Sequence, residues 1–205
     1  MATADFEVRQ LLKAYRKGLI SDALFAEQMQ ELSNGNNKPR GFTYNGKTHA
    51  SEREMIMNLL DEFRCAENFA SEYLNRWIQV SDQECVKGGL RTIQQRETFH
   101  AQLLETRLRE LGGVPQCTVP TERREQELKF YASADKKDLE KVQSIAERIK
   151  DPAVVLKSIT DVIDQITEDQ QSKELLRTLV DDEMSSIKWL LEACQTLSAT
   201  AAPTQ

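Results

Sequence analysis

The sequence predicts an all-α protein built as an antiparallel four-helix bundle, with a helical hairpin in front of it. Two observations lead to this prediction. The eight glycines and five prolines of the 205 residues gather in a few short stretches. Between these stretches lie segments whose apolar residues recur three and four positions apart, as they do along the buried side of an α-helix. No stretch has the combination of alternation and turns that indicates paired strands.

Residues 1–33 are predicted to form the helical hairpin. Two stretches within this range have helical spacing, and Ser21 is suited to be the N-cap of the second. A hairpin of this size cannot bury a core by itself, so we expect it to pack on the main body or on a partner. Residues 34–50 are rich in Asn, Gly, Lys and Pro and are predicted to be a linker, in which His49 is exposed to solvent.

Residues 51–198 are predicted to form the bundle, and residues 199–205 a disordered tail. The expected helices run over Ser51–Val80, Ser81–Leu111, Asp135–Ile166 (with a break near Pro152) and Asp169–Leu197. The joints after the first and third helices are short, whereas residues 112–134 separate the second helix from the third. This spacing favours two antiparallel hairpins joined by one long crossover.

The composition argues against several classes of function. A net charge of −6 argues against broad electrostatic binding of nucleic acid or of an anionic membrane. No apolar run approaches the roughly 20 residues that a membrane helix needs. The first residues lack the apolar core of a signal peptide, so we expect a cytoplasmic protein. The four cysteines have no C-x-x-C spacing and are expected to be reduced side chains rather than a zinc or redox motif.

Each predicted bundle helix has an apolar seam, and three of these seams are interrupted at the middle. The first helix places Glu67 there, the second places Glu97 and His100, and the fourth places Glu183. The seam of the third helix is apolar throughout. In antiparallel helices of similar length the midpoints fall in one layer. The sequence therefore predicts that three carboxylates and one imidazole meet halfway along the bundle.

Such a cluster calls for a compensating cation. Each buried carboxylate loses several kcal/mol of solvation, and neighbouring negative charges raise the pKa values of one another. The Glu-x-x-His spacing of Glu97 and His100 puts both side chains on one face of a helix, from which they can bind the same ion. The predicted metal ligands are thus Glu67, Glu97, His100 and Glu183.

Three segments resemble the ligand motifs of a known family. AENFASEYL (66–74) is similar to the first-helix motif of rubrerythrin-like, ferritin-like di-iron proteins. ETFHAQLLETRLRELGG (97–113) is similar to their second-helix Glu-x-x-His motif, and VDDEMSSIKWLLE (180–192) to their fourth-helix motif. The resemblance covers about residues 51–197 and implies a ferritin-like four-helix bundle, a fold that often forms a homodimer. It also implies that Glu67 is a terminal ligand, Glu97 and Glu183 are bridging ligands, and His100 is a nitrogen ligand.

The chain departs from the family pattern at two places. Ser186 stands where the fourth helix normally has a histidine, and the third helix offers Ala153, Leu156 or Lys157 in place of a glutamate. One half of a degenerate di-iron site remains, so we expect one ion per chain. Three carboxylates and an imidazole suit Fe(II) or Mn(II), with Zn(II) as an alternative. The two-metal peroxidase, oxygenase and ferroxidase reactions of the family are not expected.

Two alternatives stay open. The cluster could hold two metals, completed by water, Asp161 or Asp164. It could instead hold no metal, with protonated glutamates or with Lys157 as the counter-charge. The chain would then be a scaffold that acts through contacts with a protein partner. The docking face would be the apolar residues of the hairpin, which are Leu11, Leu12, Tyr15, Phe25 and Met29. Tyr73 is expected either to donate a hydrogen bond to a carboxylate or to serve packing alone.

Overall fold

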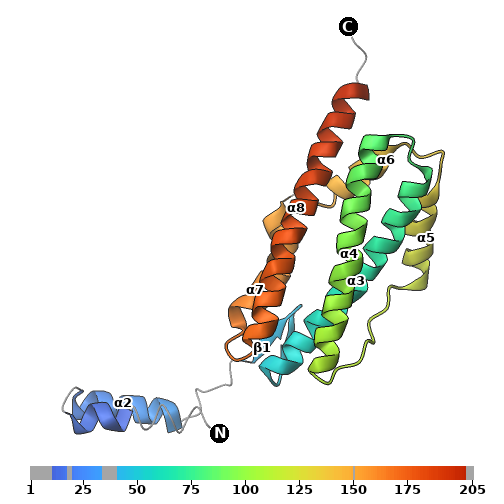
Figure 1. Cartoon of the computed structure of the whole chain (residues 1–205). Helices are drawn as coiled ribbons and strands as arrows, with labels where there is room; N and C mark the ends of the chain where they lie inside the picture. The colour runs from blue at the N-terminus through green and yellow to red at the C-terminus, as the bar shows by residue number, and fades with distance from the viewer. Residues whose placement is uncertain (1–10, 18–19, 34–40, 150, 202–205) are drawn as a thin grey trace. The chain divides into compact units, whose positions relative to one another are not determined.

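The computed structural model describes residues 11–17, 20–33, 41–149 and 151–201. These residues are largely helical, and the sheet among them has two short strands. The chain divides into two compact units, Met1–Gly41 and Phe42–Gln205, which are both drawn in Figure 1. Apart from the small sheet, the all-α class predicted from the sequence is confirmed.

The first unit contains two helical stretches, residues 11–16 and α2 (Asp22–Ser33). Oγ of Ser21 accepts a hydrogen bond from the backbone N–H of Leu24, with 3.3 Å between nitrogen and oxygen, which confirms the predicted N-cap. The rings of Tyr15 and Phe25 stack with their centroids 4.2 Å apart. This aromatic contact joins the two helical stretches.

The second unit begins with a β-hairpin that the sequence prediction missed. Strand β1 (Phe42–Tyr44) pairs antiparallel with β2 (Lys47–His49). The turn residues Asn45 and Gly46 have φ values of 54° and 74°, as a type I′ turn requires. The Asn-Gly pair was the signal that could have revealed the hairpin. The predicted linker and the predicted absence of strands are therefore wrong for residues 42–49, while residues 34–40 lie outside the described ranges.

The predicted exposure of His49 is also wrong. Its side chain is 7% exposed, and its Nδ1 lies 3.9 Å from Oε1 of Glu54 on α3. The hairpin is held to α7 as well, because the side-chain amide of Gln165 donates to the backbone carbonyl of Thr43 (2.8 Å) and accepts from its N–H (2.7 Å). The hairpin therefore packs against two helices of the second unit.

The helices of the second unit lie close to their predicted positions. They are α3 (Glu52–Val80), α4 (Glu84–Glu110), α5 (Thr121–Ala132), α6 (Asp138–Ala146), α7 (Pro152–Gln165) and α8 (Gln170–Ala201). Figure 1 shows α3 beside α4, and α6 and α7 both pack on α8. Within the described ranges, no helix is long and apolar enough to cross a membrane.

Two helix ends bear on the predictions. The break expected near Pro152 is confirmed, because Pro152 is the first residue of α7 and Oδ1 of Asp151 accepts a hydrogen bond from the N–H of Ala153 (2.9 Å). The disordered tail is wrong for residues 199–201, which are still helical, and residues 202–205 lie outside the described ranges.

The apolar seams are buried and form two hydrophobic clusters. On α3, the first cluster reaches Phe63 and the second begins with Leu74. On α4, Ile93 belongs to one cluster and Leu104 to the other. The candidate ligands of both helices lie between these boundaries. They are polar groups enclosed between two apolar regions.

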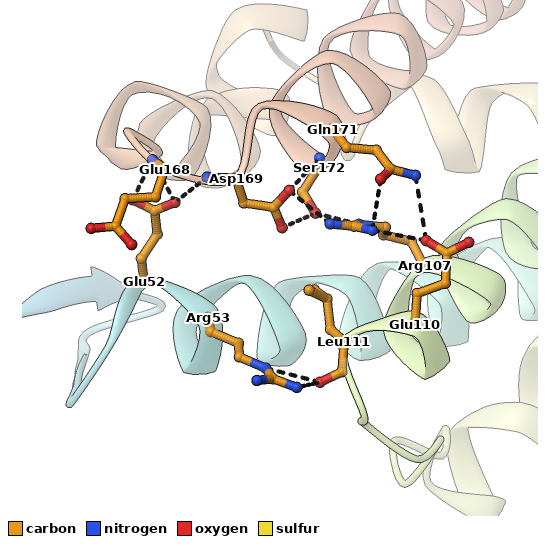
Figure 2. Close-up of polar contacts among 9 residues, drawn as sticks. All are labelled: Glu52, Arg53, Arg107, Glu110, Leu111, Glu168, Asp169, Gln171 and Ser172. Carbon is orange, nitrogen blue, oxygen red and sulfur yellow. Dashed lines mark hydrogen bonds and ion pairs between the residues drawn. The ribbon is translucent and has the colours of Figure 1, made fainter.

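A polar cluster fixes the start of α8 against α3 and α4, as Figure 2 shows. The carboxylate of Glu52 on α3 accepts hydrogen bonds from the backbone N–H groups of Glu168 (3.0 Å) and Asp169 (2.8 Å). Arg107 of α4 donates to Oδ1 of Asp169 (2.7 Å) and to Oγ of Ser172 (2.8 Å). These bonds satisfy backbone N–H groups that have no partner within the helix at its start. They also fix how far along the bundle Glu183, the candidate ligand on α8, lies.

Candidate metal centre

The four predicted ligands come together in the second unit. Glu67 lies on α3, Glu97 and His100 on α4, and Glu183 on α8, and one ligand atom of each lies within 4.8 Å of the others. Three of the side chains are buried, and Glu183 is half-buried. The midpoints of the helical seams thus meet, as the sequence analysis expected.

The imidazole of His100 is held at both nitrogens. Its Nδ1 lies 3.1 Å from Oε1 of Glu183 and 3.4 Å from Oε2 of Glu67. Its Nε2 lies 3.2 Å from Oδ2 of Asp182. Nδ1 therefore faces the carboxylate cluster and is the nitrogen that could bind a metal. Nε2 is left to hold the ring through a neighbouring carboxylate, as metal-binding histidines usually do.

Asp182 is a residue that the sequence prediction missed. It directly precedes Glu183 on α8, and the two consecutive acids lie on either side of the imidazole ring. The acidic run from Asp181 to Glu183 was the signal in the sequence, but it does not reveal which acid reaches the histidine. That depends on the rotation of α8 relative to α4.

The carboxyls of Glu67 and Glu97 are the most strongly perturbed groups of the site. Burial raises the pKa of Glu67 to about 8, and the negative charge of Glu183 adds to the effect. Burial, followed by the contact with Glu67, raises the pKa of Glu97 to about 11. A ligand oxygen of each carboxyl lies within 4.8 Å of the other. The raised pKa values mean that the pair keeps at least one proton at neutral pH.

One carboxylate oxygen is left without a bond. Oε2 of Glu67 is buried and has no hydrogen-bond partner among the described residues. Nδ1 of His100 is nearby at 3.4 Å, but it is aligned with Glu183 instead. A buried acceptor without a donor costs free energy. This oxygen points to a ligand that supplies positive charge.

His100 favours its protonated form when no metal is present. Burial by itself lowers the pKa of the imidazole, but the hydrogen bonds to Glu183 and Asp182 outweigh burial, and the pKa is raised overall. Protonated His100 donates through both nitrogens. Binding of a metal at Nδ1 would release that proton.

Ser186, where the family resemblance predicts a histidine in a two-metal site, binds an arginine of α4. Ser186 is buried, and its Oγ accepts a hydrogen bond from Nη1 of Arg96 on α4 (2.9 Å). Arg96 also donates to the backbone carbonyl of Asp182 (2.9 Å). The guanidinium of Arg96 thus joins α4 to α8 beside the cluster.

The additional residues considered on the third helix do not reach the cluster. Nζ of Lys157 lies 2.6 Å from Oδ1 of Asp161, and both side chains are more than half exposed. Asp164 is exposed as well. A second metal site completed by Asp161 or Asp164 is therefore wrong, because these side chains point to solvent. Lys157 as the counter-charge of the cluster is wrong for the same reason. The third helix instead contributes apolar side chains next to the cluster, among them Leu156 and Ile159.

Tyr73 serves packing in this structure. Its ring stacks on Tyr131 with centroids 4.6 Å apart and meets the edge of Phe69 at 5.5 Å. Within the described ranges, no hydrogen bond joins its hydroxyl to a carboxylate. Burial and the charges of Tyr131 and Glu97 raise the pKa of Tyr73, so the hydroxyl keeps its proton.

A cavity of about 610 Å³ lies next to the cluster. Glu67, Glu97 and Glu183 form part of its wall, and most of the rest is apolar. The loop between α4 and α5 and the helices α6 and α7 line it on other sides. Its volume is in the range of cavities that hold small molecules. A small molecule in this cavity would therefore reach the carboxylates and contact the apolar walls.

The comparisons with known proteins found no match to this chain. No family model matches the chain, and no significant match was found among curated proteins or solved structures. The likeness to ferritin-like proteins therefore depends on the three sequence motifs. The site itself must be judged by its chemistry.

The residues fit a divalent metal ion. Three carboxylates and an imidazole nitrogen are suitable donors, and they converge within one ligand shell. The unbonded Oε2 of Glu67 lies on the side of the cluster that Nδ1 of His100 also faces. Loss of the protons on Glu97 and His100 would turn both side chains into ligands.

Proposed function

We propose that the chain is a ferritin-like four-helix-bundle protein that binds one redox metal ion, iron or manganese. The ligands in this proposal are Glu67, Glu97, His100 and Glu183, and the ion serves in the handling of iron, oxygen or peroxide. The observation that carries the proposal is the burial of several carboxylates around one imidazole, with an unbonded oxygen on Glu67. A bound cation would pair that oxygen and offset the buried negative charge.

The arrangement of the helices supports the ferritin-like part of the proposal. α3 contacts α4 and α7, and α8 contacts α4, α6 and α7. If α6 and α7 count as one broken helix, these contacts join four helices in a ring. The connection from α4 to α6 contains α5 and is long, as in a bundle with one crossover. The three motif segments lie on α3, α4 and α8, in the order that the family resemblance requires.

The donor set favours a single hard metal ion. Carboxylates suit Fe(II) and Mn(II), and one imidazole strengthens the binding of iron. Ser186 and Arg96 fill the place of the second metal's histidine, and α7 provides apolar side chains. We therefore propose one ion per chain.

The chain's own residues would orient the metal site and shelter it. Iron or manganese, when bound, would supply one-electron chemistry with oxygen or peroxide. Asp182 accepts from Nε2 of His100 and keeps Nδ1 turned toward the carboxylates. Glu97 holds a proton at the edge of the cavity. The apolar walls would surround much of the small molecule that enters.

A metal-free scaffold is the second candidate, and one observation favours it. The cluster can offset part of its own charge, because the pKa values of Glu67 and Glu97 are raised and His100 bridges Asp182 and Glu183. The chain would then act through protein contacts, with the apolar residues of the first unit as the docking face. Homodimer formation is a further proposal that either candidate allows.

Metal titration separates the two candidates. Fe(II) or Mn(II) is added anaerobically to metal-free protein in a calorimeter. We expect one ion per chain, and binding weaker by more than about 100-fold in Glu97→Gln, because loss of an outer-shell partner alone costs 10–100-fold. Glu105→Gln is the matched control, since Glu105 lies on the same helix and pairs with Arg109 at the surface. Absence of binding in the unaltered chain would favour the scaffold.

A further inference from the structure

Two cysteines meet at the wall of the same cavity. Cys65 lies on α3 and is buried, and Cys117 lies in the loop between α4 and α5. Both are free thiols, and both line a small cavity of about 290 Å³. Both also line the cavity that Glu67, Glu97 and Glu183 line. The two thiols therefore share one cavity with the candidate metal centre.

The backbone of Cys117 is fixed against the helical turn that carries Cys65. Oδ2 of Asp61 accepts hydrogen bonds from the N–H groups of Gln116 (2.8 Å) and Cys117 (2.7 Å). Nη2 of Arg64 donates to the carbonyl of Cys117 (3.0 Å) and to Oδ1 of Asp61 (2.8 Å). Asp61 and Arg64 both lie within the turn that leads to Cys65. The loop is thus bound on both sides of the Cys117 peptide, and this holds Cys117 beside the turn of α3 that carries Cys65.

We infer that Cys65 and Cys117 form a dithiol–disulfide couple that supplies two electrons for the reduction of peroxide in this cavity. In this step each thiol loses its proton and an S–S bond forms, while the O–O bond of hydrogen peroxide breaks. The two electrons and two protons pass to the oxygen atoms, which leave as two molecules of water. The inference rests on the proposed function, because the couple would act together with the metal centre.

The surroundings of the thiols explain why the metal centre is needed. Burial and the contact with Cys65 raise the pKa of Cys117 to about 11, against 9.0 for a free thiol. The thiolate, which is the nucleophile toward peroxide, is then scarcer than usual at neutral pH. Direct oxidation of this pair is therefore slow. A reaction at the carboxylate–imidazole cluster, in the same cavity, provides a faster route.

The test compares two forms of the full chain. One is metal-free, and the other is loaded with Fe(II) anaerobically and desalted to remove unbound iron. Each form receives one equivalent of hydrogen peroxide and is then denatured and treated with N-ethylmaleimide. A fully reduced chain has four cysteines to label, whereas the disulfide leaves two. Peptide mapping identifies the cross-link, and elemental analysis gives the iron content of the same sample.

We expect the iron-loaded chain to form the Cys65–Cys117 disulfide at least about tenfold faster than the metal-free chain, because thiolate is scarce. Cys117→Ser should prevent the loss of two labelling sites. Cys85→Ser is the matched control, since Cys85 is exposed on α4, and it should leave the reaction unchanged.

The outcomes separate this inference from the proposed function. An iron-loaded chain whose Cys65 and Cys117 both remain open to labelling overturns the couple and leaves the metal centre intact. A chain that binds no iron but still forms the disulfide with peroxide supports the couple and overturns the metal centre. Oxidation at Cys85 or Cys194 with Cys65 and Cys117 reduced also overturns the couple.

Discussion

At the scale of single residues, His100 is positioned by two neighbouring acids of α8. Glu183 meets Nδ1 and Asp182 meets Nε2, so one short segment of α8 fixes the ring in position and orientation. The cluster keeps Nδ1 and the buried oxygens of Glu67 and Glu97 close together. A ligand set held in this way needs little reorganisation to accept an ion.

Asp182→Asn tests this positioning role. The substitution keeps the shape of the side chain but weakens the hold on Nε2. We expect metal affinity to fall by about 10–100-fold, with the protein still folded, because outer partners of ligands have effects of this size. Calorimetric titration with Fe(II) or Mn(II) measures it. Asp181→Asn, at the exposed neighbouring position, is the control, and an equal effect of the two substitutions would contradict the role of Asp182.

The buried carboxyls also make a prediction about pH. Metal-free protein should lose stability as the pH rises from about 5 to about 8. The folded chain holds protons on Glu67, Glu97 and His100, whose pKa values are raised, while the unfolded chain releases them at lower pH. Fewer protons on the unfolded chain mean that the free energy of unfolding falls with increasing pH. Carboxylates with lowered pKa values, such as Glu52, are already ionised in this range and do not oppose the trend.

Urea unfolding of metal-free protein at several pH values measures this effect. Glu97→Gln should flatten the dependence, because the residue with the largest shift no longer titrates. Glu105→Gln should leave the dependence as it is. If Glu97→Gln kept the full slope, the protonated pair of Glu67 and Glu97 would be wrong.

At the scale of helices, α8 packs a tryptophan ring against a glycine of α4. A Cβ at Gly89 would lie 1.8 Å from Cζ2 of Trp189, whereas a Cβ at Gly88 would have nothing within 4 Å. The indole therefore packs on the backbone of α4. This contact and the Arg107 contacts at the start of α8 help to align the candidate ligands of the two helices.

The two adjacent glycines give a matched pair of substitutions. Gly89→Ala should destabilise the protein by about 1–3 kcal/mol, because the rigid ring must move. Gly88→Ala should stabilise it by about 0.5–1 kcal/mol, because alanine favours a helix and meets no neighbour. Urea unfolding measures both. Equal effects of the two substitutions would contradict the close approach of α4 and α8.

The long helices could be predicted because each has a repeated apolar pattern that one face must bury. For the same reason the depths of Glu67, Glu97, His100 and Glu183 could be predicted from their places in the seams. Asp182 and Arg96 could not, because their contacts depend on the rotation of one helix against another. The β-hairpin was missed despite its Asn-Gly turn, since its strands are three residues each and show little alternation.

At the scale of the whole molecule, the candidate site lies entirely within the second unit. Its ligands come from three helices, so a bound ion would cross-link α3, α4 and α8. An ion that binds the folded chain and not the unfolded chain stabilises the fold by mass action. The buried carboxylates destabilise the metal-free protein, and the same carboxylates would attract a metal ion.

Counting the metal in the purified protein tests the central claim most directly. Protein without a metal-binding tag is analysed for its elements as isolated and again after anaerobic addition of Fe(II) and desalting. We expect about one iron or manganese per chain, lost in His100→Ala. Two ions per chain would contradict the single half-site. No metal in either sample would contradict the metal centre and favour the scaffold.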